Sequence, residues 1–211
     1  MQTDKITNLY EKTKKLYLGK EGLFYHGWHH IDFVIRKSLE FSESLNADKF
    51  LVESSAILHD TNYLIKRYSK PCVAKDLRAE LLSKCDFNIQ DSMSIETIIN
   101  EAHLENRNKN ISLEAQALSD ADTLFKALPI TPILLTHRYL SQTGVSIRKL
   151  GEEIINNQIP LMNKGIYFYS NSANENYLKW AETNIQLWEN VISSLNDPVV
   201  SKLVNELNSI S

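Results

Sequence analysis

A histidine followed directly by an aspartate, His59-Asp60, stands at the end of a largely apolar run over residues 51–58. Imidazole nitrogens and carboxylate oxygens are the ligands that borderline and hard divalent cations select. More groups of these two kinds lie before and after the pair, at His26, His29, His30, His103, Asp120 and Asp122. Histidines and aspartates in this number and order predict a site for a divalent metal ion.

The elements that must position these residues are predicted to be helices. Apolar residues recur at steps of three and four between residues 178 and 195, which is the pattern of a long amphipathic helix. Similar stripes run through residues 31–39, 73–82 and 95–102. Because the helical period dominates along the chain, we predict an all-α fold.

Capping and helix-breaking residues divide these helices. Asn46 and Asp48 are suited to cap the helix that precedes the His-Asp pair. A helix that begins near Ser112 is predicted to end before Pro129. The short aromatic run at residues 166–169 is predicted to be a loop or a helix cap rather than part of a sheet.

Composition fits one ordinary globular domain over residues 1–211, with 43% apolar and 23% charged residues. A net charge of -3 argues against a nucleic-acid polymer as partner, because such binding needs a basic face. No stretch approaches the roughly 18–20 apolar residues that cross a membrane. Cys72 and Cys85 are too few for a disulfide framework, so we expect free thiols in a cytoplasmic protein.

Helix geometry decides which candidate ligands can meet. If a helix begins near His26, then His26 and His30 are one turn apart and share a face, whereas His29 points elsewhere. His59 and Asp60 are about 100° apart around a helix, so both bind one cation only if it lies at the helix end or on its flank. Asp122 is predicted on a core-facing helix, where a carboxylate is costly to bury unless it is paired or bound to metal.

The order His, His-Asp, Asp resembles the HD-domain superfamily of metal-dependent phosphohydrolases, which is named for the doublet. The resemblance covers about residues 20–130 and implies a helical bundle. Residues 131–211 lie outside it, and their helical periodicity predicts additional C-terminal helices. It implies that one divalent metal ion is held by four residues, His30, His59, Asp60 and Asp122. Asp120 is the alternative to Asp122, which is favoured because it follows Ala121 and precedes a helical apolar position.

The resemblance also implies roles in proton transfer. Tyr25-His26 followed by His30 is similar to a segment of cyclic-nucleotide phosphodiesterases, in which the earlier histidine donates a proton to the leaving oxygen. His26 is therefore a candidate general acid, with His103 as the alternative. Asp60 is expected to orient or deprotonate the attacking water. A second metal is less expected than one, because His103 is the only further histidine between the doublet and Asp122.

The predicted activity is hydrolysis of a phosphate ester in a nucleotide or another small phosphorylated metabolite, through a metal-activated water. Lys66 and Arg67 are candidate phosphate-binding residues. The ligand types do not distinguish Mn, Fe, Ni, Zn and Mg. Two alternatives share the fold: an iron-dependent oxygenase, and a ligand-binding or regulatory module without catalysis. Aromatic residues within 172–211 also allow a homodimer.

Overall fold

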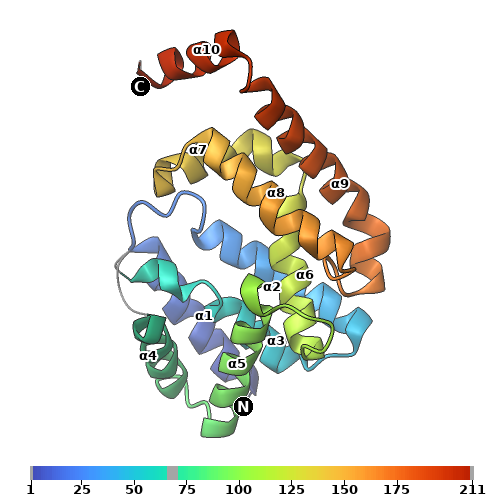
Figure 1. The fold of residues 1–211 in the computed structure, drawn as a ribbon. Helices are drawn as coiled ribbons and strands as arrows, with labels where there is room; N and C mark the ends of the chain where they lie inside the picture. Colours follow the sequence, from blue (N-terminus) through green and yellow to red (C-terminus); the bar gives the residue numbers. More distant parts are fainter. Residues whose placement is uncertain (1, 66–70, 210–211) are drawn as a thin grey trace.

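The computed structural model describes residues 2–65 and 71–209, and Figure 1 shows that this part of the chain is built from helices. No strand occurs in these ranges, so the predicted all-α fold is confirmed. None of the described helices combines the length and the apolar character needed to cross a bilayer. The helices, with two short 3-10 helices named η, are α1 (Gln2–Leu18), α2 (Trp28–Leu45), α3 (Lys49–Leu58), η1 (Thr61–Leu64), α4 (Pro71–Ser83), α5 (Ile89–Ala102), η2 (Leu104–Asn106), α6 (Leu113–Ala127), α7 (Ile130–Thr143), α8 (Ile147–Asn163), α9 (Asn171–Ser194) and α10 (Pro198–Ser209).

The centre of the fold is formed by α2, α3 and α6, which pack against one another, while α5 packs on α3. Each of the three central helices buries apolar side chains completely or nearly so, among them Ile31, Val34, Ile57, Leu58, Leu118 and Leu124. Burying one such side chain contributes about 1.5–3 kcal/mol. These contacts therefore fix the positions of the three helices relative to one another.

The two ends of α3 follow from single residues. Asp48 accepts hydrogen bonds from the backbone N–H groups of Phe50 (2.8 Å) and Leu51 (3.2 Å), so it caps α3 as predicted. Asn46 instead ends α2, with a φ of 54° in the left-handed region. The helix stops at Leu58, and the chain then turns into η1. The His-Asp pair lies in this turn rather than within a helix.

The C-terminal helices α7, α8 and α9 lie beside α6 (Figure 1), with α8 packed on α9 and α9 packed on α6. Gly144 ends α7 with a φ of 71°, a conformation that costs glycine little. The connection between α8 and α9 is filled by the buried side chains of Tyr167 and Phe168. The aromatic run at residues 166–169 is thus a buried loop, as predicted. In Figure 1, α10 extends away from the other helices.

Candidate metal centre

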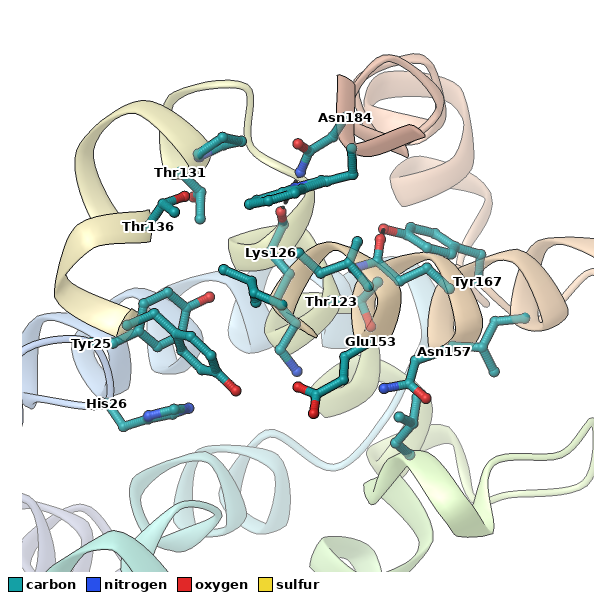
Figure 2. A pocket seen from close by; sticks show the side chains of 18 of the residues that line it. Tyr25, His26, Thr123, Lys126, Thr131, Thr136, Glu153, Asn157, Tyr167 and Asn184 are labelled. Carbon is teal, nitrogen blue, oxygen red and sulfur yellow. Dashed lines mark hydrogen bonds between the residues drawn. The ribbon is translucent and has the colours of Figure 1, made fainter. Parts of the chain in front are cut away.

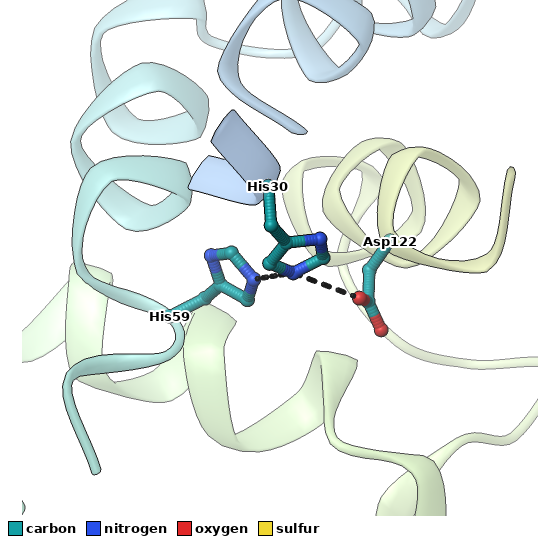
Figure 3. Close-up of side chains that lie close together, drawn as sticks. All are labelled: His30, His59 and Asp122. Atoms are coloured by element: carbon teal, nitrogen blue, oxygen red, sulfur yellow. Dashed lines mark hydrogen bonds and ion pairs between the residues drawn. The ribbon is translucent and has the colours of Figure 1, made fainter. Parts of the chain in front are cut away.

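Three of the predicted ligands meet between α2, α3 and α6. His30, His59 and Asp122 each present one donor atom, and these atoms lie within 4.8 Å of one another (Figure 3). The Nε2 atoms of His30 and His59 are 3.2 Å apart, and Asp122 Oδ1 is 3.5 Å from His30 Nε2. His30 comes from the first turn of α2, His59 from the end of α3, and Asp122 from α6. These three residues are called the metal cluster below.

The fourth predicted ligand, Asp60, reaches the same two histidines. Its Oδ2 is 3.1 Å from His30 Nε2 and 3.5 Å from His59 Nε2. Burial raises the pKa of this carboxyl, but the neighbouring His59 and His30 lower it by more, so the net pKa lies well below the ordinary value. Asp60 is therefore a carboxylate at neutral pH.

The hydrogen bonding of the histidines suits a metal ion. His59 Nδ1 is 2.8 Å from the backbone oxygen of Ala56 and must carry the hydrogen to donate to it, which leaves a lone pair on Nε2. His30 is 1% exposed, and its Nδ1 has no hydrogen-bond partner in the described part of the chain. Its ring packs edge-on against Phe125, with ring centroids 4.5 Å apart. Two imidazole Nε2 atoms beside carboxylate oxygens form a donor set for a divalent cation.

Asp120 and Asp122 have different roles in the structure. Asp120 is completely buried and accepts hydrogen bonds from the backbone N–H groups of Tyr169 (2.7 Å) and Ser170 (2.8 Å). Burial raises the pKa of Asp120 to about 6, although these hydrogen bonds act in the opposite direction. Asp120 thus connects α6 to the start of α9. The structure brings Asp122, and not Asp120, to the histidines.

Lys126 and Arg107 provide positive charge beside the cluster. Lys126, one helical turn after Asp122, donates to Asp122 Oδ2 at 2.6 Å. Arg107 Nη2 lies 3.8 Å from the same oxygen. Burial raises the pKa of Asp122, but Lys126 and His30 lower it by more, and the net pKa is well below the ordinary value. Asp122 therefore faces His30 with one oxygen and Lys126 with the other.

A cavity of about 250 Å³ lies on the other side of Lys126 and Arg107 from Asp122, and Figure 2 shows part of its wall. Lys126 and Arg107 line it from the side of the metal cluster, and residues of α7, α8 and α9 form much of the remaining wall. Sequence reasoning did not single out Lys126. The four-residue spacing from Asp122 was the available signal, because it places both side chains on one helix face. The C-terminal helices, to which the sequence analysis assigned no role, thus form much of the cavity wall.

His26 lies near the site, but it precedes α2 and is not part of this helix. A helix does begin near His26, but its N-cap is Gly27 and its first residue is Trp28, so His26 precedes the helix and does not lie on it. Its ring nevertheless lies 6.0 Å from that of His30 and stacks on Tyr63, with centroids 3.7 Å apart. Burial lowers the pKa of His26 to about 4, with neighbouring charges contributing in both directions. Tyr25, His26 and Tyr63 all line the cavity.

The other predicted site residues lie elsewhere. His103 is exposed at the C-terminal end of α5, and it belongs neither to the metal cluster nor to the described cavity wall. The structure therefore gives no support to a proton-donating or second-metal role for His103. Arg107, four residues later, is buried and donates to the backbone oxygen of Ala102 and to Thr123. Lys66 and Arg67 lie outside the described residues.

Comparison with known proteins shows what the fold is similar to. No protein-family model and no curated protein matches the chain. A crystal structure of a Lactobacillus plantarum protein is similar at 18% identity with a TM-score of 0.68, covering 93% of this chain and 97% of that one. Bacillus subtilis YpgQ, solved in complex with ADP, is similar at 17% identity with a TM-score of 0.65, covering 95% and 98%. At these identities the similarity establishes the shared helical fold.

The two neighbouring aspartates of α6 give a prediction about stability and metal binding. Asp120→Ala leaves two backbone N–H groups without their acceptor, so we expect the free energy of unfolding to fall by about 2–4 kcal/mol. Asp122→Ala should change the free energy of unfolding of the metal-free protein by less than about 1 kcal/mol, as expected for a partly exposed ion pair. Urea denaturation measures both changes.

The same pair of variants separates the metal ligand from the structural carboxylate. After incubation with Mn²⁺ and desalting, we expect elemental analysis to find the metal in Asp120→Ala and not in Asp122→Ala. Metal retained by Asp122→Ala and lost from a folded Asp120→Ala would assign the ligand to Asp120 and contradict the geometry.

Proposed function

We propose that this chain is a metal-dependent phosphohydrolase of the HD-domain type, acting on a nucleotide or another small phosphorylated metabolite. One observation carries the proposal. Polar atoms of His30, His59, Asp60 and Asp122 lie close together, and Lys126, whose ammonium group contacts Asp122, lines a neighbouring cavity. A metal site beside a lysine and an enclosed space is the combination that phosphate-ester hydrolysis needs.

His30, His59, Asp60 and Asp122 would hold one divalent ion. When bound, such an ion lowers the pKa of a water molecule and polarises a phosphoryl oxygen. The mixed nitrogen and oxygen ligands are compatible with Mn, Fe, Ni, Zn or Mg. A single ion is proposed, because His103, the residue on which a second site depended, is exposed and lies outside the metal cluster.

Asp60 and Lys126 act on the substrate side of this site. Asp60, ionised through its histidine neighbours, would accept a hydrogen bond from the attacking water and orient it. Lys126 has a side chain that is 43% exposed and lines the cavity, so its ammonium can bind a phosphate oxygen while it stays beside Asp122. Arg107 is already engaged by Ala102, Ser119 and Thr123 and contributes mainly positive charge.

A nucleotide is the preferred substrate class for two reasons. YpgQ shares the fold over nearly the whole of both chains, and it was solved with ADP. The cavity here combines the aromatic rings of Tyr63, Tyr139 and Trp188 with the amides of Asn157 and Gln158. Aromatic surfaces and amides are the groups that pack on and hydrogen-bond to planar heterocycles.

The first experiment measures metal content and hydrolysis in the same preparations. We expect the parent to retain about one equivalent of metal after incubation with Mn²⁺ and desalting, and to release phosphate or pyrophosphate from a panel of nucleotides. Asp60→Ala should lose the metal and at least about a hundredfold in kcat/KM, because it removes both a ligand and the group that binds the water.

Asp76→Ala is the matched control, because it removes an exposed carboxylate from α4, outside the site. It should keep the metal content and the activity of the parent. The proposal is wrong if the metal-loaded parent hydrolyses none of the nucleotides or other phosphate esters tested. It is equally wrong if Asp60→Ala hydrolyses them as fast as the parent.

Lys126 gives a separate prediction about substrate binding. Replacing it with methionine keeps most of the side-chain volume and removes one charged hydrogen bond to phosphate, worth roughly 1.5–3 kcal/mol. We expect Lys126→Met to raise KM about tenfold or more with a smaller effect on kcat, measured by steady-state kinetics. Lys126→Arg should recover most of the loss. An unchanged KM in Lys126→Met would show that the phosphate binds elsewhere.

A further inference from the structure

Gln142, near the end of α7, holds the chain just before α2. Its side-chain oxygen accepts hydrogen bonds from the backbone N–H groups of Tyr25 (2.8 Å) and His26 (3.2 Å). Its side-chain nitrogen lies 2.8 Å from His26 Nδ1. The three contacts join residues that are 116 or 117 positions apart in the sequence. The side chain of Gln142 therefore contacts both the backbone and the ring of His26.

These contacts determine which way round the amide lies. Both backbone groups are donors, so the Gln142 atom that faces them must be the oxygen. The NH₂ group therefore faces His26, and because it only donates, Nδ1 must be the acceptor. A hydrogen on Nδ1 would place two donors against each other at 2.8 Å. The hydrogen of the His26 ring thus belongs on Nε2.

We infer that Gln142 is a positioning residue that fixes His26 as the Nε2–H tautomer, so that His26 donates a hydrogen bond to the phosphorylated substrate and keeps its hydrogen. The part of this inference that concerns a hydrogen bond to the substrate rests on the proposed function. His26 lies at one edge of the cavity (Figure 2), and its ring plane is held by the stack on Tyr63. With Nδ1 engaged, Nε2 is the ring nitrogen left for the substrate.

This role differs from that of a general acid. A histidine that delivers a proton must first carry hydrogens on both ring nitrogens, and the NH₂ group of Gln142 opposes the hydrogen on Nδ1. A fixed Nε2–H instead stabilises negative charge on a substrate oxygen through a hydrogen bond, and no bond to hydrogen breaks. His26 therefore contributes as an oriented donor in the wall of the cavity.

The test replaces the side-chain NH₂ group of Gln142, which faces the His26 ring, and keeps the side-chain oxygen, which faces the backbone N–H groups. Gln142→Glu keeps an oxygen for the N–H groups of Tyr25 and His26, but it places a second acceptor opposite Nδ1. We expect the neutral ring of His26 in this variant to carry its one hydrogen on Nδ1, so that Nε2 loses its hydrogen and can no longer donate. Gln186→Glu, on the exposed face of α9, adds the same charge outside the cavity and is the control.

Nitrogen-15 NMR of histidine-labelled, full-length protein loaded with Zn²⁺ reports the tautomer directly. Parent and Gln186→Glu should show His26 with hydrogen on Nε2 and a bare Nδ1, and Gln142→Glu should show hydrogen on Nδ1. His26→Phe, which preserves a ring to stack on Tyr63, assigns the signals. A hydrogen on Nδ1 in the parent overturns the inference, and the parent spectrum alone decides this if Gln142→Glu does not fold.

Kinetics test the donor role on whichever nucleotide the parent hydrolyses. We expect Gln142→Glu and His26→Phe each to lower kcat/KM about tenfold, the cost of one hydrogen bond of about 1.4 kcal/mol, and the double variant to lose no more than either. Independent, additive losses would overturn the coupling. If the parent hydrolyses nothing, the proposed function and the donor role fall together, while the NMR result still decides the tautomer.

Discussion

The packing of α2 against α3 and α6 is the constraint on which the site depends, because each of these helices delivers one part of it. On α2, His30 is followed by the fully buried Ile31, and on α3 the fully buried Leu58 immediately precedes His59. Asp122 lies on the face of α6 that packs toward them. Apolar contacts that fold the bundle thus also hold the donor atoms. His30 and Asp122 lie on packed helices, and His59 and Asp60 lie in the turn that directly follows the buried end of α3.

Charge is the second constraint, because the packed helices bring two carboxylates to one largely buried place. Unpaired, Asp60 and Asp122 would be costly to bury beside each other. The structure offsets part of this cost with the ammonium of Lys126 and the nearby Arg107. The Nε2 atom of His30 can donate a hydrogen bond to Nε2 of His59, because His59 carries its own hydrogen on Nδ1. A divalent cation bound beside the two carboxylates would offset the rest of their burial cost, so we expect metal binding to stabilise this fold.

Residue type and order were enough to predict His30, His59, Asp60 and Asp122, which the structure brings together, because few side chains bind divalent metals. Position along a helix was harder to predict. His103 follows a helical stripe, yet α5 ends just before it and leaves it exposed. Lys126 lies one helical turn after Asp122 and lines the cavity. The cavity depends on how α7, α8 and α9 are placed relative to α6, and no local sequence pattern predicts that placement.

The parts of the chain before and after about residue 130 therefore have different roles in the structure. Residues before about 130 carry the candidate metal ligands, and the central bundle sets their geometry. Residues after 130 close the cavity and, through Gln142, orient the ring of His26. The contact between Gln142 and His26 joins residues 116 positions apart, and no sequence motif predicts such a contact. If the proposed function is right, two chains with this fold could keep the same metal ligands and still differ in the substrate that they accept, because residues of α7, α8 and α9 form much of the cavity wall.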